Sequence, residues 1–256
     1  MQYKHKKKFT GILLAAGNGK RFSNELSQVF WPKQFLVIQD KKTILEVSLE
    51  KIAPFASKVV VALPSFFFEG GKNNEVEFDL KTLINKLQII CKQKNTELVL
   101  VPGGKERQNS VESCLTKVET EYLFVHDAAR PLVHNLDLER LLNLTIEKDA
   151  AILAKPIVDT VKKIKENSES SGSAFIKETL DRTKLWNAET PQAFLTDLYI
   201  NCFEQAKIQN LQVTDDASII EMTSNSEVHL VESKHPNFKI TTQTDFLIAQ
   251  ALFDLV

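Results

Sequence analysis

Cysteine is scarce in this sequence of 256 residues, and its placement is uninformative for cross-linking. The three cysteines are odd in number, far apart and without C-x-x-C spacing: Cys91, Cys114 and Cys202. This pattern argues against a disulfide framework and against a zinc site. We expect all three to be reduced residues of the core.

An excess of charge of one sign is also lacking. The chain has 32 Lys and Arg against 33 Asp and Glu, a formal net charge of -1. Such a chain has no bulk field that would attract nucleic acid or anionic lipid. A polyanionic ligand must therefore be bound by locally placed cations, and we expect a small ligand rather than nucleic acid or a membrane.

No long apolar run follows the basic N-terminus. The apolar stretch after residues 1–8 reaches glycines and Lys20 too soon for a signal sequence or a membrane span. We expect residues 1–8 to be a solvated basic tail, residues 9–256 to form a single domain, and the protein to be cytoplasmic.

What the sequence does contain is a regular alternation of strand and helix patterns. Short apolar runs typical of buried parallel strands occur at residues 11–14, 59–63, 98–101, 122–125 and 151–154. Amphipathic helical stretches lie between or after them, at residues 43–52, 80–90, 110–118 and 136–146. The alternation predicts an α/β fold with a doubly wound, mostly parallel, Rossmann-like sheet whose ligands bind at the carboxyl ends of the strands.

Two segments interrupt this alternation. Residues 64–77 contain three consecutive phenylalanines and then a polar stretch, which indicates a loop insertion with locally packed aromatic rings. Residues 165–173 are polar and turn-rich, and we expect them to be the tip of a projecting β-arm with strands at 160–164 and 175–180. Beyond the arm, the patterns predict helices at 195–206 and 215–222, a strand at 228–231, and a last helix begun by Thr242 or Thr244.

The first strand runs into the loop A-A-G-N-G-K-R at residues 15–21, which suits an anion cradle. It is neither a Walker A loop, because Leu14 and Arg21 occupy required positions, nor a dinucleotide fingerprint, because Phe22 replaces a small residue. Alone, the loop is equally compatible with a simple strand-turn. The motif P-K-Q at 32–34 follows it, and Lys33 with Arg21 could neutralise a triphosphate that reacts at its α-phosphorus.

Further motifs occur in a recognisable order along the chain. They are G-G-K-E-R-Q-N-S-V at 103–111, H-D-A-A-R-P at 126–131, D-T at 159–160, D-R at 181–182, L-W at 185–186, T-P-Q at 190–192, T-D-D-A at 214–217 and N-F-K-I-T at 237–241. From about Thr10 onward the chain resembles the 2-C-methyl-D-erythritol 4-phosphate cytidylyltransferase family of the sugar-nucleotide pyrophosphorylase superfamily. The related ribitol 5-phosphate cytidylyltransferases resemble it at the CTP site, but the segment from Asp181 to Ala188 favours the former family.

The resemblance implies a transfer of CMP from CTP to methylerythritol phosphate in non-mevalonate isoprenoid biosynthesis, with Mg²⁺ or another divalent cation. The implied catalytic cations are Arg21, Lys33 and Lys239. The nucleotide would be bound by Ala15, Ala16, Gly17, Gly104, Ser110, Asp127 and Ala128, with Asp127 also the candidate ligand of Mg²⁺. From the residues alone, Asp127 could equally cap the segment that follows it.

The acceptor would be bound by Arg130, Thr160, Arg182, Thr190, Thr214 and Lys239. In the family the arm, at about residues 157–187, reaches across a homodimer, so that Thr160 and Arg182 would serve the neighbouring site.

The sequence departs from the family at several positions. Residues 24–29 lengthen the loop before Lys33, Trp31 adds an aromatic ring, and Lys105 stands where an acidic residue is common. Two rival functions are a catalytically silent nucleotide-binding protein and, less favoured by the glycine pattern, a nicotinamide-dependent dehydrogenase.

Overall fold

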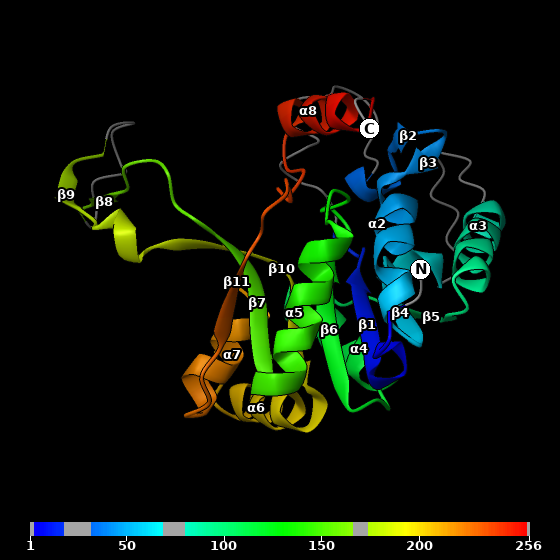
Figure 1. Ribbon diagram of the computed structural model, residues 1–256, viewed down its shortest axis with the longest axis horizontal. Helices are drawn as coiled ribbons and strands as arrows, with labels where there is room; N and C mark the ends of the chain where they lie inside the picture. Colours follow the sequence, from blue (N-terminus) through cyan, green and yellow to red (C-terminus); the bar gives the residue numbers. More distant parts are fainter. Residues whose placement is uncertain (1–2, 18–31, 69–79, 166–173, 255–256) are drawn as a thin grey trace.

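A single seven-stranded sheet forms the centre of the molecule (Figure 1). The computed structural model describes residues 3–17, 32–68, 80–165 and 174–254. The strands lie in the order β11-β7-β10-β6-β1-β4-β5. Their bounds are β1 Phe9–Leu14, β4 Lys58–Leu63, β5 Glu97–Pro102, β6 Tyr122–Asp127, β7 Ala150–Pro156, β10 Trp186–Leu195 and β11 His229–Glu232.

All neighbouring strands except β10 are parallel. Strand β1 pairs in parallel with β4 and β6, β4 with β5, and β7 with β11, whereas β10 is antiparallel to both β6 and β7. The five strands predicted along the first part of the chain and the strand at 228–231 are confirmed. The mostly parallel sheet is therefore the predicted one.

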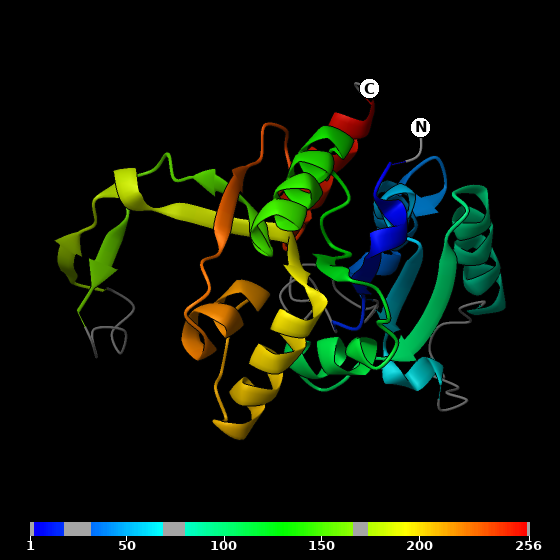
Figure 2. The ribbon, with the colours of Figure 1, turned by 60° about the horizontal axis from the view of Figure 1, so that its bottom comes forward.

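Helices cover both faces of the sheet, because side chains of each buried strand point alternately to the two sides. In β1, Phe9 and Leu13 pack against the helices of one face and Ile12 against those of the other. The first face carries α2 Ile44–Ile52, α3 Leu80–Gln93 and α5 Asn135–Lys148; the second carries α4 Arg107–Leu115, α6 Thr196–Ile208 and α7 Asp216–Thr223 (Figures 1 and 2). Among the described residues, no helix combines the length and hydropathy needed to cross a bilayer.

The C-terminal helix packs beside a small hairpin rather than on the sheet. Helix α8 Gln243–Asp254 contributes Ala249 to an apolar cluster with Ile38 of strand β2 Val37–Gln39, which pairs with β3 Lys42–Thr43. Thr242 accepts a hydrogen bond from the Asp245 amide, 3.2 Å, which is the N-terminal cap predicted for this helix. Short 3₁₀ turns complete the chain: η1 Lys6–Lys8, η2 Lys33–Phe35, η3 Ala53–Phe55, η4 Ser65–Phe67 and η6 Arg182–Lys184.

The predicted arm projects from the sheet, as Figures 1 and 2 both show. Strands β8 Lys162–Ile164 and β9 Ile176–Thr179 pair antiparallel in a separate two-stranded sheet, and all of their residues are exposed. Of the predicted tip at 165–173, residues 166–173 lie outside the described ranges. Lys165 is described, and its amide donates to the Phe175 carbonyl.

Strand β10 was not predicted from the sequence. Its segment W-N-A-E-T-P-Q-A-F-L contains a proline and four polar residues, a composition that argues against a central strand. In the structure the register shifts between Ala188 and Gln192, so the polar residues between them leave the regular ladder. Their polar groups are satisfied by other partners, which allows them to be buried in the middle of the sheet.

The prediction that residues 1–8 form a solvated tail is wrong for the part that the structure describes. Tyr3 is buried against Phe9 and Phe55, and its hydroxyl donates to Asn143 Oδ1, 2.9 Å. The Lys6 ammonium is also buried and donates to the Asn95 carbonyl, 2.9 Å. An aromatic ring and a satisfied ammonium group therefore tie this basic segment to the sheet domain.

The local packing predicted for the phenylalanine insertion is confirmed for two of the three rings, since Phe66 packs on Phe67 with ring centroids 4.4 Å apart. Phe67 packs on the core, with its ring centroid 5.4 Å from that of Phe35. Phe68, in contrast, is 46% exposed. The three cysteines are buried free thiols, as predicted.

Candidate active site

A cavity of about 700 Å³ lies at the carboxyl ends of β1, β4, β5 and β6. This is the edge of a doubly wound sheet where ligands bind. Eight of the predicted site residues line it: Ala15, Ala16, Gly17, Lys33, Gly104, Ser110, Asp127 and Lys239. Segments separated by more than two hundred residues of sequence therefore meet in one place.

The loop after β1 is held in place by a buried glutamine. The Gln34 amide group donates to the carbonyls of Ala15, 2.5 Å, and Gly17, 3.0 Å. The Ala15 amide donates to the Ala62 carbonyl, 2.9 Å. Because Gln34 follows Lys33 directly, the same short turn that holds the loop brings Lys33 to the cavity wall.

The segment after β5 approaches this loop very closely. A Cβ atom added to Gly103 would lie 2.1 Å from the Ala16 Cβ, so only glycine fits between the two backbones. The Ser110 hydroxyl accepts a hydrogen bond from the Gly104 amide, 3.1 Å, and donates to the Glu106 carbonyl, 3.3 Å. This wall offers backbone groups at short range, which is what the recognition of a pyrimidine edge requires.

Two cations flank the one aspartate among the described residues of the cavity wall. Lys239 Nζ lies 2.7 Å from Asp127 Oδ2, and Arg107 Nε lies 3.4 Å from Asp127 Oδ1. Burial by itself would raise the pKa of the Asp127 carboxyl, but the charges of Arg107 and Lys239 hold it well below its usual range. Asp127 is therefore ionised across the physiological range.

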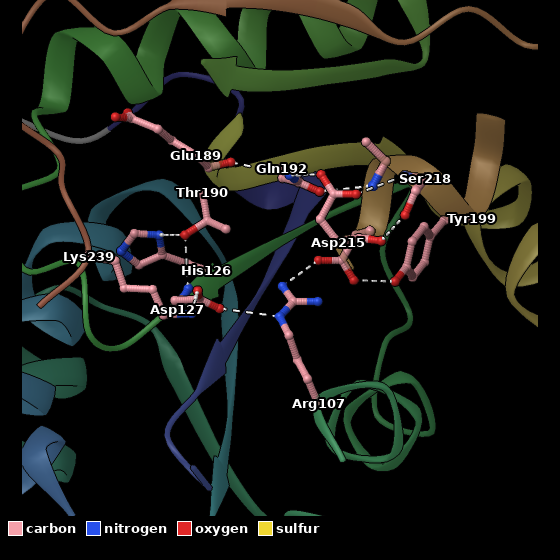
Figure 3. A network of polar contacts seen from close by, with 12 residues as sticks. Arg107, His126, Asp127, Glu189, Thr190, Gln192, Tyr199, Asp215, Ser218 and Lys239 are labelled. Carbon is pink, nitrogen blue, oxygen red and sulfur yellow. Dashed lines mark hydrogen bonds and ion pairs between the residues drawn. The ribbon is translucent and has the colours of Figure 1, made fainter. Parts of the chain in front are cut away.

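Arg107 also contacts a second, fully buried carboxylate. Its Nη2 donates to Asp216 Oδ2, 2.6 Å, and Tyr199 donates its hydroxyl to Asp216 Oδ1, 2.6 Å (Figure 3). Burial lowers the pKa of Arg107, but the two carboxylates outweigh it and raise the pKa above its ordinary value. Arg107 thus stays charged between two anions.

The polar residues of β10 support the same wall from behind. Thr190 Oγ1 accepts a hydrogen bond from the Asp127 amide, 3.1 Å, and lies 3.1 Å from His126 Nδ1 (Figure 3). The other ring nitrogen, His126 Nε2, lies 3.1 Å from the Arg130 carbonyl and must donate to it. Burial lowers the pKa of His126, so the ring is neutral near pH 7 and Nδ1 accepts from the Thr190 hydroxyl.

A second β10 residue holds the segment that carries Lys239. Glu189 Oε2 accepts from Ser233 Oγ, 2.6 Å, and from Asn237 Nδ2, 3.0 Å. The Arg130 guanidinium donates to the Asn237 carbonyl, 2.7 Å. Lys239 follows two residues later, so its backbone is anchored to the sheet while its side chain reaches the cavity.

The remaining predicted residues lie elsewhere. Thr160 and Arg182 are exposed on the arm, and Thr214 is exposed before α7. Ala128, Arg130 and Thr190 lie behind the wall rather than on it, and Ala128 accepts a hydrogen bond from Ser48 Oγ, 2.7 Å. Arg21 and the insertion at 24–29 fall outside the described residues, so the roles predicted for all of these residues stay predictions.

Four residues of the site were not predicted from the sequence: Gln34, Arg107, Tyr199 and Asp216. Gln34, Arg107 and Asp216 lie inside motifs recognised in the sequence. Their hydrogen-bond and ion-pair partners, however, could not be predicted from those motifs. Tyr199 lies in a helical stretch and looks like an ordinary core aromatic residue. Lys105 does line the cavity, next to Glu106.

The described residues contain no cluster of three or more side chains suited to hold a metal ion. Asp127 is one carboxylate, and Mg²⁺ in nucleotide sites is commonly held by one or two carboxylates together with substrate phosphates. Among the described residues, this donor set fits a cation that arrives with a nucleotide.

The fold and cavity define the class of the protein. A doubly wound sheet with a backbone cradle and lysines at its carboxyl edge is a Rossmann-like nucleotidyltransferase architecture. The crystal structure of 2-C-methyl-D-erythritol 4-phosphate cytidylyltransferase from Francisella tularensis has this fold, with a TM-score of 0.70 and 30% identity, and the match covers 96% of this chain and 99% of that one. The Thermus thermophilus structure of the same name gives a TM-score of 0.71 at 27% identity, covering 95% and 98%.

Sequence comparisons identify the family. Residues 9–254 match the family model for 2-C-methyl-D-erythritol 4-phosphate cytidylyltransferase. The Bacillus cytotoxicus protein of that name is 35% identical over 246 residues, which are 95% of this chain and 96% of the relative. The chloroplastic protein of Oryza sativa is 33% identical over 253 residues, 95% of this chain and 73% of the relative. The chain belongs to the 2-C-methyl-D-erythritol 4-phosphate cytidylyltransferase family.

The contact between Gly103 and Ala16 gives a testable pair of substitutions. Gly103→Ala places a methyl group against the Ala16 Cβ and should weaken nucleotide binding by about tenfold, because it displaces the loop after β1. Ala16→Gly in the same chain removes this contact and should restore part of the affinity, because the tighter-than-usual contacts with Ser110 Oγ at 3.1 Å and the Leu63 carbonyl at 3.2 Å remain. Calorimetric titration with CTP measures both. Equal affinity of Gly103→Ala and the unmodified protein would contradict this packing.

The neutral state of His126 predicts a pH-dependent stability. Burial lowers its pKa to about 4, against about 6.5 in an unfolded chain. As the pH falls, the unfolded state therefore takes up the proton on His126 before the folded state does. The free energy of unfolding is unaffected by the titration of this residue above about pH 6.5 and decreases as the pH falls toward 4. The full difference corresponds to roughly 3 kcal/mol.

Urea unfolding at pH 7 and pH 4.5, without nucleotide or divalent cation, measures this loss. The unmodified protein should lose about 2 kcal/mol more than His126→Gln, which keeps a donor and an acceptor but does not titrate. The other four histidines are present in both proteins and serve as the internal reference. Parallel losses in the two proteins would show that His126 is not held neutral.

Proposed function

We propose that this chain transfers CMP from CTP to 2-C-methyl-D-erythritol 4-phosphate, giving 4-diphosphocytidyl-2-C-methyl-D-erythritol and pyrophosphate. Membership of the family over nearly the whole chain supports this reaction. The observation that carries it is the cavity itself, where the backbone cradle of residues 15–17 and Gly104 faces the same space as Lys33 and Lys239. A base can be read at one part of this wall while phosphates are neutralised at another.

The chemistry is an in-line substitution at the α-phosphorus. An oxygen of the acceptor phosphate forms the new bond to the α-phosphorus, and the bond to the oxygen that bridges to the β-phosphate breaks, which releases pyrophosphate. No protein nucleophile is required, because the acceptor phosphate is already ionised near neutral pH. Positioning and charge stabilisation then supply most of the acceleration.

The cations have separate tasks in this scheme. Lys33, held beside the loop by Gln34, would neutralise the triphosphate, and the predicted role of Arg21 is the same. Lys239, which is paired with Asp127 in this structure, would stabilise the negative charge that develops at the α-phosphorus. Asp127 is the carboxylate that would hold Mg²⁺, which when bound adds positive charge beside the phosphates.

The acceptor side is proposed to be completed by a second copy of the chain. The arm exposes large apolar side chains to solvent, which is unusual unless another surface covers them: Val158, Phe175, Ile176 and Trp186. Thr160 and Arg182 lie on this arm and do not line the cavity of their own chain. We infer a homodimer in which each arm supplies these two residues to the partner's site. The buried free thiols fit a reducing compartment, and we propose that the enzyme is cytoplasmic.

Pyrophosphate release on mixing the protein with CTP, Mg²⁺ and methylerythritol phosphate tests the reaction. Lys33→Ala and Lys239→Ala should each lower kcat by about a hundredfold or more, because each removes a charge from the phosphates. Lys148→Ala, at the far end of α5, is the matched control and should leave turnover unchanged. Near-normal turnover in both cavity variants would refute the assignment.

The same assay separates the alternatives. Ribitol 5-phosphate, offered in parallel, should give a much lower kcat/KM than methylerythritol phosphate. A preference for ribitol 5-phosphate would overturn the acceptor, and CTP binding without pyrophosphate release for either acceptor would indicate a silent nucleotide-binding protein.

Complementation between two inactive variants tests the shared site. Arg182→Ala removes an arm residue and Lys239→Ala a cavity residue, so each homodimer should be inactive. In a co-expressed mixture, half of the dimers are mixed and each has one intact site, which should restore roughly a quarter of the activity. Absence of recovery, with mixed dimers demonstrated by differential tags, would place both residues in the site of one chain.

A further inference from the structure

A buried carboxylate and a buried tyrosine lie next to the cavity and have no part in the reaction described above. Asp216 is 1% exposed and Tyr199 is fully buried. Figure 3 shows Tyr199 on the side of Arg107 that faces away from Lys239, and both Tyr199 and Arg107 bind Asp216. Asp216 and Tyr199 come from α7 and α6, two helices that otherwise contribute apolar residues to one face of the sheet.

Burying a carboxylate is costly unless its charge is paired and its oxygens are hydrogen-bonded. Asp216 meets both conditions, because Oδ2 accepts from Arg107 Nη2 and Oδ1 from the Tyr199 hydroxyl, each at 2.6 Å. The neighbouring Asp215 differs, since it caps α7 by accepting from the Ser218 amide, 3.1 Å. The helix therefore begins without help from Asp216, and the Asp216 carboxylate is directed to Arg107.

The guanidinium of Arg107 connects this buried pair to the cavity wall. Nη2 is bound to Asp216, which leaves the Nε edge directed toward Asp127 Oδ1 at 3.4 Å. Asp127 Oδ2 in turn accepts from Lys239, 2.7 Å. Charges of opposite sign thus alternate from the core to the cavity: Asp216, Arg107, Asp127, Lys239.

Without Asp216, the guanidinium would have one carboxylate partner in this series instead of two. A planar guanidinium then favours a bidentate pair with Asp127, which would compete with Lys239 for the same two oxygens. The pull of Asp216 on Nη2 therefore keeps one oxygen of Asp127 for Lys239.

We propose that Tyr199 and Asp216 are positioning residues that fix the orientation of Arg107 and thereby hold Asp127 and Lys239 in place for the nucleotide. This role rests on the proposed function, because it acts through residues assigned to the phosphates of CTP. Arg107 is also the first residue of α4, directly after the segment with Gly103 and Gly104. The same anchor thus fixes one end of the cradle.

The test uses Tyr199→Phe, which removes a single hydroxyl and leaves the aromatic packing intact. Asp216 variants are less suitable, because they leave the Arg107 charge without its buried partner and are prone to misfold. Tyr122→Phe is the matched control, since Tyr122 is another buried tyrosine, at the opposite end of the strand that carries Asp127. Thermal unfolding of both variants reports the loss of stability alone.

We expect Tyr199→Phe to weaken CTP binding and to lower kcat each by about tenfold, because one hydrogen bond to a buried charged group is lost. Tyr122→Phe should match the unmodified protein in both. In an Arg107→Lys background, where the planar guanidinium group is absent, Tyr199→Phe should change neither the CTP affinity nor kcat further.

Two results would overturn the proposal: Tyr199→Phe equal to Tyr122→Phe in CTP affinity and kcat, or an undiminished effect of Tyr199→Phe in the Arg107→Lys background. CTP affinity is measured by calorimetry without acceptor. A protein that binds CTP in a Tyr199-dependent manner but releases no pyrophosphate would therefore contradict the proposed function while leaving the positioning role supported.

Discussion

The site depends on the neutralisation of one carboxylate, Asp127, at the end of a central strand. An anion here would repel a triphosphate, and its burial would favour protonation. Cations from two distant segments, Arg107 and Lys239, prevent both effects by holding it charged and balanced. The cavity can therefore contain a buried carboxylate without losing its attraction for phosphates.

The single antiparallel strand makes this arrangement possible. Strand β10 inserts between β6 and β7 and carries Glu189, Thr190 and Gln192 into the interior. Thr190 binds the end of β6, Glu189 the segment before Lys239, and Gln192 the start of α7, where it contacts both Asp215 and the Ala217 amide. One strand thus orients three parts of the wall, and it continues directly into the base of the arm.

Local patterns were sufficient to predict most of the sheet and the helices. Runs such as residues 59–63 have one interpretation, because a short, wholly apolar stretch after a helix is buried. Strand β10 could not be predicted in this way, since the side-chain partners of Glu189 and Thr190 lie 44 to 64 positions away in the chain. The prediction of a solvated tail was wrong for a related reason. Residues 1–8 are mostly basic, but Tyr3 among them packs on residues of other segments, such as Phe55.

Only the part of the site that lies in recognisable motifs was predicted from the sequence. Gly104, Ser110 and Lys239 are recognisable because they lie in ordered motifs, and the structure brings them to one cavity. Arg107 and Tyr199 are defined by contacts across 109 and 17 positions with Asp216, and no local pattern contains these contacts. Residues that touch a ligand leave a signature in sequence, whereas residues that orient them are found only from the packed structure.

The distance along the chain between Asp127 and Lys239 has a consequence for synthesis of the protein. The two residues are 112 positions apart, so a ribosome adding 5–20 residues per second makes the lysine roughly 6 to 22 seconds after the aspartate. During that interval β1, β4, β5, β6 and Arg107 have been synthesised, but the Asp127 carboxylate still lacks its lysine. The charge balance of the site is therefore among the last features of the molecule to be established as the chain emerges.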